Sequence, residues 1–555
     1  MKETISYVCG TSDEPLIYQT IGDTFDQAVE QWADKDAIVV CHQDVRWSYR
    51  RLGEAVDAFA GGLLALDLEP GDRVGIWSPN NIEWVIAQFA TAKAGLILVN
   101  INPAYRKGEL TYTLNKVGCK ALILAREFKT SDYVGMLRDI APAIDNAESG
   151  RLNLPELPDL RTLIVINDEP VNGMFRFAEI AAMAPADADT SLAAMALTFQ
   201  PDDAINIQFT SGTTGLPKGA TLTHFNVVNN AFFVGQAMNL SARDRLCIPV
   251  PLYHCFGMVL GVLACVTRGA TMVFPSEAFE PRAVLQAVSE ERCTALHGVP
   301  TMFIAELEEP EFKSFDLGSL RTGIMAGAPC PIEVMRKVIS EMNMSEVTIA
   351  YGMTETSPVS FQSATDDPLE KRVSTVGRVH PHVQVKIIDE QGMVVPRGTS
   401  GELCTRGYSV MLAYWGDGEL TAEDIDKAGW MHTGDLAVID EDGYCDIVGR
   451  VKDMIIRGGE NIYPREIEEY LFQHPKIQEV AVFGVPDEKY GEAVATWIRL
   501  HEGVVLSEDE IRDYCKEQIA YYKVPKYIRI VDEFPMTVTG KIQKFIMREK
   551  TLETL

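Results

Sequence analysis

The sequence has little positive charge for its length. Its 555 residues contain 50 Lys and Arg against 79 Asp and Glu, which gives a formal net charge of −29 at pH 7. Proteins that bind nucleic acid or anionic lipid without sequence specificity need a basic surface, and this composition does not supply one. We therefore expect no nucleic-acid partner, and any anionic ligand would have to be bound by a few locally placed groups.

Long apolar segments are also lacking. The apolar run Met258–Val266 is far shorter than the roughly 18 residues that a membrane-spanning helix needs. A secretory signal has a basic stretch followed by an apolar one, and the first residues of the chain do not show this pattern. We expect no integral membrane segment.

Paired cysteines are missing as well. The 11 cysteines are scattered, and none stands in a Cys-x-x-Cys spacing. An odd, dispersed set in a long chain is typical of reduced thiols, because disulfide frameworks belong mainly to small secreted domains. We predict a cytoplasmic protein. The sequence does not determine the oligomeric state, and a homodimer is one alternative.

Short apolar segments alternate along the chain with helix-length amphipathic ones. Asp36–Val40, Asp72–Trp77 and Thr162–Ile166 have the composition of buried strands. This alternation predicts an α/β fold whose sheets are mostly parallel.

The pattern changes near Arg450. Further along, Pro464 opens a helical segment, two strand-like segments follow, and Ser507 is placed to cap a helix that runs to about Tyr521. Such a unit is large enough to fold alone. We predict a large N-terminal domain over residues 1–451 with packed, mostly parallel α/β sheets, and a small α+β C-terminal domain over 452–555.

The most specific local signal is the segment Thr210–Gly219, which reads Thr-Ser-Gly-Thr-Thr-Gly-Leu-Pro-Lys-Gly. Glycines allow close backbone approach, while hydroxyls, N–H groups and Lys218 are suited to phosphate oxygens. Pro217 stands where a Walker A motif needs its second glycine, so this is not a P-loop of the kinase or GTPase type. The segment predicts a phosphate-binding loop of another kind.

The loop is similar to the signature loop of the AMP-forming acyl-CoA synthetases, luciferases and peptide-synthetase adenylation domains. Further segments match this superfamily in the same order: Tyr351–Glu355, Thr433–Asp435, Gly449–Glu468 and Pro535–Lys541. The stretch Gly75–Arg106 resembles the medium-chain branch of the acyl-CoA synthetases. The resemblance covers most of the chain.

The resemblance implies a nucleotide site. In it, Tyr351 stacks on adenine, Thr354 contacts the α-phosphate, Glu355 holds Mg²⁺, and Asp435 binds the ribose. On local grounds alone, Tyr351 equally fits a core position, and the Thr354-Glu355 pair equally fits a helix cap with a first-turn acid. The residues implied for the nucleotide are Thr210, Ser211, Gly212, Thr213, Thr214, Gly215, Lys218, Gly327, Ala328, Pro329, Tyr351, Gly352, Met353, Asp435 and Arg450.

Lys541 matches the catalytic lysine of the superfamily. Attack of a carboxylate on the α-phosphorus brings two anions together, so a cation placed there would stabilise the transition state. Taken alone, a Gly-Lys near the C-terminus is more typical of a solvated surface lysine. The implied catalytic residues are Lys541, Thr354, Glu355 and His254.

The resemblance also implies an acyl pocket and a mobile C-terminal domain. The pocket would be formed by Tyr253, His254, Phe256 and Gly257, although a lone histidine in this apolar setting equally fits the core. The small domain would rotate about Lys452, bringing the coenzyme A-binding residues Arg457, Gly458 and Gly459 to the site.

The function implied is ATP-dependent carboxylate–CoA ligation through an acyl-adenylate. The substrates would be ATP, coenzyme A and a short- to medium-chain fatty acid, with Mg²⁺ as cofactor. Two alternatives stay open: an aryl or thioether acid as the substrate, or an acceptor other than coenzyme A. A silent nucleotide-binding scaffold would be expected to lack Lys541 or Glu355, and both are present. A Rossmann dehydrogenase would need a Gly-x-Gly-x-x-Gly motif after its first strand, and the sequence has none there.

Overall fold

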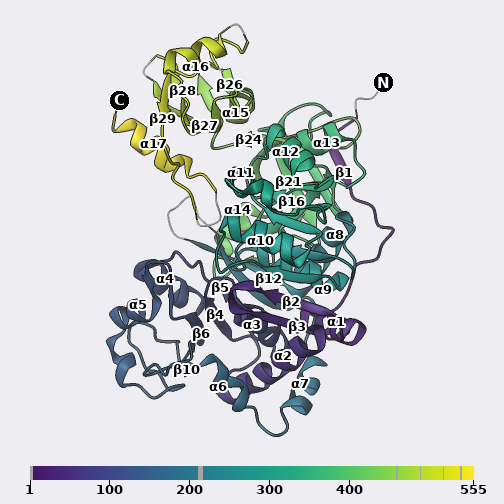
Figure 1. The fold of residues 1–555 in the computed structure, drawn as a ribbon, viewed down its shortest axis with the longest axis vertical. Helices are drawn as coiled ribbons and strands as arrows, with labels where there is room; N and C mark the ends of the chain where they lie inside the picture. Colours follow the sequence, from purple (N-terminus) through teal and green to yellow (C-terminus); the bar gives the residue numbers. More distant parts are fainter. Residues whose placement is uncertain are drawn as a thin grey trace.

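The computed structural model describes residues 4–210, 217–457, 460–487, 489–516, 518–537 and 541–554. Three sheets form the large part of the molecule, and the residues after about 455 form a smaller unit at one end (Figure 1). Within the described ranges, no helix is both long and apolar enough to cross a bilayer.

The first large sheet has eight strands and is parallel from β10 to β11. Its order is β10 (Phe175–Arg176), β9 (Thr162–Ile166), β6 (Ala121–Ala125), β4 (Arg73–Trp77), β5 (Ile97–Asn100), β11 (Ala204–Thr210), β12 (Lys218–Thr223) and β22 (Ala413–Tyr414). The last two strands join antiparallel, so β11 and β12 form a hairpin around residues 211–216, which lie outside the described ranges.

The second large sheet has nine strands and a parallel centre from β17 to β2. Its order is β19 (Arg378–Val379), β18 (Val359–Gln362), β17 (Glu346–Gly352), β16 (Thr322–Ala326), β15 (Ala295–Gly298), β13 (Arg245–Cys247), β14 (Thr271–Phe274), β2 (Asp36–Val40) and β3 (Val45–Ser48). The apolar runs predicted as strands, β2, β4 and β9, all lie inside the sheets and not at their edges, where their side chains are buried on both faces.

Helices packed between these sheets complete one shared core. The helices are α1 (Ile21–Trp32), α2 (Tyr49–Leu63), α3 (Ile82–Lys93), α8 (His224–Ala237), the π-helical segment η4 (Phe256–Leu263) and α9 (Ala264–Arg268). Their starts are set locally: the Asn81 side chain accepts from the Trp84 N–H, and Thr223 forms a capping box with Asn226.

The outer faces of the sheets carry the remaining helices. Those that contribute to the outer cores are α4 (Lys107–Val117), α5 (Tyr133–Ile140), α10 (Pro281–Glu291), α11 (Pro300–Leu307) and α12 (Ile332–Glu341). Shorter or peripheral helices are α6 (Phe177–Ala182), α7 (Ala188–Ala196), α13 (Leu369–Ser374) and α14 (Gly418–Asp424).

A third sheet of the large part is wholly antiparallel. Its strands are β1 (Tyr7–Cys9), β20 (Val383–Ile388), β21 (Gly401–Gly407), β23 (Met431–Ile439) and β24 (Cys445–Arg450). The predicted α/β class with mostly parallel sheets is confirmed for the two large sheets, and this third sheet adds to it.

The C-terminal unit has its own sheet and cores. The sheet contains β26 (Glu460–Ile462), β25 (Ile455–Arg457), β28 (Gly491–Leu500), β27 (Ile477–Asp487) and β29 (Tyr527–Ile530), and it packs with α15 (Pro464–Phe472), α16 (Glu508–Cys515) and α17 (Lys544–Leu552). Ser507 caps α16 as predicted, but the helix ends at Cys515 and not near Tyr521.

Helix α11 contains a buried acid that makes the stability depend on pH. Glu306 is fully buried, and neither of its carboxylate oxygens has a hydrogen-bond partner among the described residues. Burial raises its pKa well above the usual value, so the folded state keeps its proton while the unfolded state loses it near pH 4.5. Stability from this group is therefore complete below that pH and is lost as pH rises through the folded pKa.

We expect Glu306→Met to melt at a higher temperature than wild type, with a difference that widens between pH 5.5 and 8.5. The free energy behind this difference grows by at most about 1.4 kcal/mol per pH unit. Glu306→Gln, whose side chain cannot titrate, should lose the same part of the pH dependence of the melting temperature as Glu306→Met. A constant difference across this range in thermal melts would show that Glu306 is ionised in the folded protein.

Candidate active site

Polar residues from both large sheets meet where strands end. Thr210 ends β11, Gly352 ends β17, and Glu355 follows in a single 3₁₀ turn (Thr354–Thr356). The Thr210 hydroxyl donates to Glu355 Oε1 over 3.3 Å, which joins the two sheets at this point. Thr354 and Glu355 are both buried. Ligand sites in α/β proteins commonly lie at such carboxyl ends of strands.

Two residues that the sequence did not reveal, Tyr414 and Asp424, extend this cluster. The Tyr414 hydroxyl lies 2.9 Å from Glu355 Oε1 and 2.9 Å from Asp424 Oδ2. Lys218 pairs with Asp424 at 3.4 Å and lies 4.8 Å from the centre of the Tyr414 ring. Burial and the Glu355 carboxylate raise the pKa of Tyr414, so its hydroxyl stays a donor.

One hydroxyl hydrogen can serve only one of these two carboxylates at a time. Lys218 compensates the charge of Asp424, whereas the donors at Glu355 Oε1, from Thr210 and Tyr414, are both uncharged. A buried carboxylate with uncharged donors is a suitable ligand for a hard divalent cation.

Asp435 holds a second cluster. Its Oδ2 atom accepts from the Tyr351 hydroxyl at 2.5 Å, and its Oδ1 atom accepts from Arg450 Nε at 3.0 Å. Asp435 on β23 pairs directly with Arg450 on β24, so the strand register places the two side chains together. Burial, then the charge of Asp435, raise the pKa of Tyr351 well above its usual value.

Two glycines allow close approach in this region. A Cβ atom at Gly352 would lie 1.6 Å from the Pro358 carbonyl oxygen, so no larger residue fits. Gly327 follows β16 with φ +87°, a left-handed conformation that favours glycine. Gly327 and Pro329 are exposed, while Ala328 and Met353 are half-buried, so solvent reaches the loops after β16 and β17.

Lys541 reaches these clusters from the C-terminal unit. Its ammonium interacts electrostatically with Arg450, Glu355 and Asp435. Burial and the neighbouring charge of Arg450 lower its pKa. The residue as a whole is exposed to solvent. Its backbone N–H donates to the Thr537 hydroxyl at 3.0 Å.

The predicted acyl-pocket segment lies at the start of η4. Burial, then the charge of Lys541, lower the pKa of His254 to about 3, so its imidazole is neutral at physiological pH. His254 Nδ1 accepts from the Phe256 N–H at 3.1 Å. Tyr253 and Phe256 are buried, and a Cβ at Gly257 would lie 2.3 Å from the Pro251 carbonyl oxygen. The segment is therefore closely packed and apolar.

Arg457 and Lys452, two further predicted residues, belong to the C-terminal part of the chain. Arg457 donates to the Tyr522 carbonyl at 2.5 Å and lies over the Tyr490 ring, both within the C-terminal unit. Lys452 follows β24 by two residues and has interactions of its own. The predicted residues Ser211, Gly212, Thr213, Thr214, Gly215, Gly458 and Gly459 lie outside the described residues.

Comparison with protein families identifies the chain. A family model described as "AMP-binding enzyme" matches residues 25–415, and one described as "AMP-binding enzyme C-terminal domain" matches residues 466–541. The chain belongs to the AMP-binding enzyme family.

Curated relatives of this family match over nearly the full length. The putative acyl-CoA synthetase YngI of Bacillus subtilis is 49% identical over 97% of this chain and 98% of its own. Medium-chain acyl-CoA ligase ACSF2 is 47% identical in Danio rerio, over 100% of this chain and 91% of the relative. The human protein of that name is 45% identical, over 98% of this chain and 90% of the relative. The predicted family and the predicted reaction class, AMP-forming acid–CoA ligation, are confirmed.

Solved structures show the same fold. The anthranilate CoA ligase AuaEII in complex with anthranoyl-AMP has a TM-score of 0.86 and 27% identity, covering 98% of this chain and 99% of that one. ATP-bound MatB from Rhodopseudomonas palustris has a TM-score of 0.82 and 28% identity, covering 96% and 99%. The predicted fold class is confirmed at the level of the whole chain.

Proposed function

We propose that this protein activates a short- to medium-chain fatty acid with ATP and transfers it to coenzyme A. In the first step the carboxylate attacks the α-phosphorus, which forms an acyl-adenylate and releases pyrophosphate. In the second step the coenzyme A thiol attacks the acyl carbonyl, and AMP leaves. The observation that carries this proposal is the electrostatic interaction of the Lys541 ammonium with Glu355, which follows β17, and with Asp435 and Arg450, which pair across β23 and β24.

The nucleotide is assigned to the two clusters. Asp435, bonded to Arg450 and Tyr351, would accept from the ribose hydroxyls, and the Tyr351 ring would stack on adenine. Thr354 and the loop that contains Lys218 would contact the phosphates. Glu355 would hold Mg²⁺, which neutralises charge on phosphate oxygens. The uncharged donors at Glu355 and its burial support that assignment.

Lys541 is assigned to the first step, and residues 457–459 are assigned to the second. The ammonium of Lys541 would stabilise the charge that develops as the carboxylate attacks. We propose that the C-terminal domain, from residue 452 onward, then turns about Lys452, withdraws Lys541, and brings Arg457, Gly458 and Gly459 to the pantetheine arm of coenzyme A. The contacts of Arg457 with Tyr490 and Tyr522, both within the C-terminal unit, support an orientation suited to the first step.

The acyl group is assigned to the segment Tyr253–Gly257. A neutral His254 beside buried aromatic side chains suits an aliphatic chain and would orient its carboxylate without adding charge. The curated relatives include proteins named for medium-chain acids, and a solved relative is named for anthranilate, an aryl acid. An aryl or thioether acid is therefore the alternative to be tested, together with an acceptor other than coenzyme A.

We expect pyrophosphate release to be greatest for straight-chain acids of about six to ten carbons, because a closely packed apolar segment discriminates by methylene count at about 1 kcal/mol or more each. The measurement is coupled pyrophosphate release across C2–C12 acids, benzoate and a thioether acid, each with and without coenzyme A. If aryl acids are faster than every aliphatic acid, the fatty-acid assignment is wrong while the adenylation chemistry stands.

Location and assembly are separate proposals. We propose a cytoplasmic location for this chain. The ACSF2 relatives are named as mitochondrial proteins, so the location is to be tested on this chain itself. A homodimer is likewise a prediction.

A further inference from the structure

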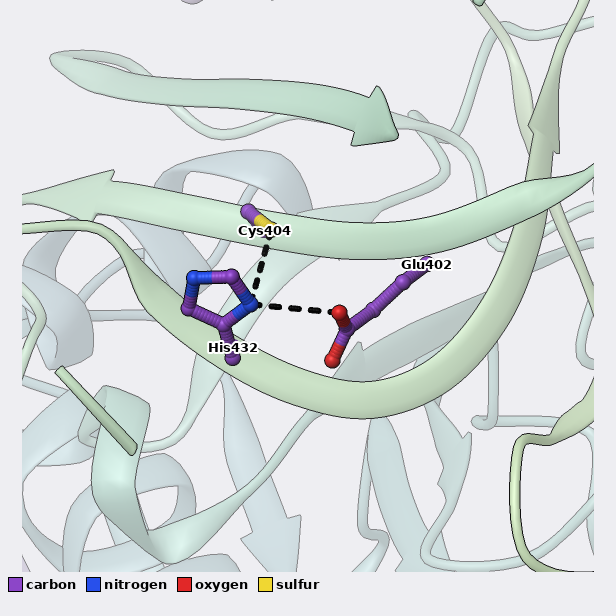
Figure 2. Close-up of side chains that lie close together, drawn as sticks. All are labelled: Glu402, Cys404 and His432. Atoms are coloured by element: carbon purple, nitrogen blue, oxygen red, sulfur yellow. Dashed lines mark hydrogen bonds and ion pairs between the residues drawn. The ribbon is translucent and has the colours of Figure 1, made fainter. Parts of the chain in front are cut away.

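Three side chains of different metal-ligating types converge on the antiparallel sheet. Glu402 and Cys404 are two residues apart on β21 and so share a face. Cys404 pairs with His432 of β23 across the ladder. Figure 2 shows all three side chains pointing toward one another, and their ligand atoms lie within 4.8 Å of each other.

The distances fit one tetrahedral centre. Cys404 Sγ lies 3.6 Å from His432 Nδ1, and Glu402 Oε2 lies 3.1 Å from the same nitrogen. Bonds of about 2.3 Å to sulfur and about 2.0–2.1 Å to nitrogen and oxygen, at tetrahedral angles, separate these ligand atoms by about 3.5 and 3.4 Å. The two distances that involve His432 are therefore within a few tenths of an ångström of tetrahedral values, and the third, between Cys404 Sγ and the Glu402 carboxylate, is within 4.8 Å and shortens if a cation binds.

The hydrogen bonding of the cluster is incomplete without a cation. Both contacts end on the same imidazole nitrogen, as the dashed lines in Figure 2 show. If Nδ1 is protonated it donates to Glu402 and cannot accept the Cys404 S–H; if it is unprotonated it cannot donate to Glu402. A Cys-His-Glu catalytic relay is excluded as well, because a relay uses both ring nitrogens. A cation at the centre would be a partner for all three groups at once.

The surroundings are those of a protected thiol with access from one side. Cys404 is fully buried and packs with Ile388 and Trp430, while the side chains of His432 and Glu402 are 31% and 28% exposed. Asp426, in the segment before β23, interacts electrostatically with the thiol and the imidazole, and Lys386 of β20 interacts with the thiol.

We propose that Glu402, Cys404 and His432 form a Zn²⁺ site, with water as the fourth ligand. Thiolate, imidazole and carboxylate together select zinc over Mg²⁺ and Ca²⁺, which prefer oxygen ligands alone. The site is distinct from the nucleotide clusters but adjoins them. Glu402 Oε1 accepts from the Gly434 N–H at 3.3 Å, and Gly434 directly precedes Asp435. Zinc binding would thus hold the turn that carries Asp435.

The test uses Co²⁺ as a spectroscopic probe on the full-length protein after treatment with a chelator. We expect one equivalent of Co²⁺ to give visible bands typical of a tetrahedral site and a near-ultraviolet sulfur-to-cobalt band, both displaced by one equivalent of Zn²⁺. Cys404→Ser should lose the sulfur band, and Glu402→Gln and His432→Asn should weaken Co²⁺ binding at least about tenfold.

Cys41→Ser is the matched control, because Cys41 is an exposed thiol outside the cluster and its loss should leave the spectrum unchanged. Metal-free melting temperatures establish that each variant is folded, and a variant that is unfolded is replaced by one of the other two. No sulfur band in the wild type, or a band that survives Cys404→Ser and disappears in Cys41→Ser, overturns the proposal.

Discussion

Lys541→Ala is expected to slow acyl-adenylate formation by about 10³-fold, while thioester formation from synthetic acyl-AMP and coenzyme A changes by less than about threefold. The loss of one preorganised charge at a developing anion typically costs this much in rate. Lys541 interacts electrostatically with Arg450, Glu355 and Asp435, so alanine removes one positive charge from the proposed site of adenylate formation. Pyrophosphate release measures the first half-reaction, and thioester formation measures the second.

The asymmetry between the two half-reactions is the decisive result. Lys550→Ala is the matched control, because this lysine is exposed on the same C-terminal unit, within α17, and should leave both half-reactions unchanged. Lys541→Arg keeps the charge with a different geometry and should recover part of the first rate. Equal losses in both half-reactions would show that Lys541 does not act in the first step alone, and the proposed rotation about Lys452 would lose its support.

Much of the fold could be predicted because its signals are local. The runs at β2, β4 and β9 are almost wholly apolar, and a strand buried on both faces needs that composition. Ser507 marked the start of α16 through its side chain and the acid that follows. The end of α16 was misplaced because the backbone turns extended at Lys516, although apolar residues beyond it, Ile519 and Tyr522, still pack against the same core.

The third sheet could not be predicted from local pattern. Its strands have mixed burial, and β23 has three consecutive half-buried residues, His432, Thr433 and Gly434, before an alternation begins at Asp435. Pairing among segments as distant as β1 and β20 depends on long-range register, which a single sequence does not encode locally. The metal cluster has the same origin, since Cys404 and His432 become neighbours only through the β21–β23 ladder.

The site was predicted unevenly for a related reason. Residues within matching motifs, such as Glu355, Asp435 and Lys541, were named in advance, and the structure brings these three together. Tyr414 and Asp424 have no motif of their own. They reach Glu355 because β22 joins the edge of the eight-stranded sheet next to β12. Residues such as these, which contact a motif residue but belong to no motif, can be identified only once the topology is known.

Glu355→Gln is expected to lower the rate of adenylate formation about 100-fold and to raise the Mg²⁺ concentration needed for half-maximal rate. The variant keeps the shape of the side chain and its contacts with Thr210 and Tyr414, but removes the charge that would hold the cation. Tyr414→Phe removes one hydrogen bond to that carboxylate, which corresponds to about tenfold in rate. Pyrophosphate release measured as a function of Mg²⁺ distinguishes the two.

The order of these effects tests the assignment of the cation ligand. Glu419→Gln on α14 is the matched control, because this acid is exposed near the cluster and should leave both the rate and the Mg²⁺ dependence unchanged. If Glu355 only organised the hydrogen bonds around Tyr414, Glu355→Gln and Tyr414→Phe would cost the same and neither would change the Mg²⁺ dependence. A larger loss for Glu355→Gln, with a shifted Mg²⁺ dependence, is the result that a charged ligand requires, since an amide oxygen binds a divalent cation far more weakly than a carboxylate does.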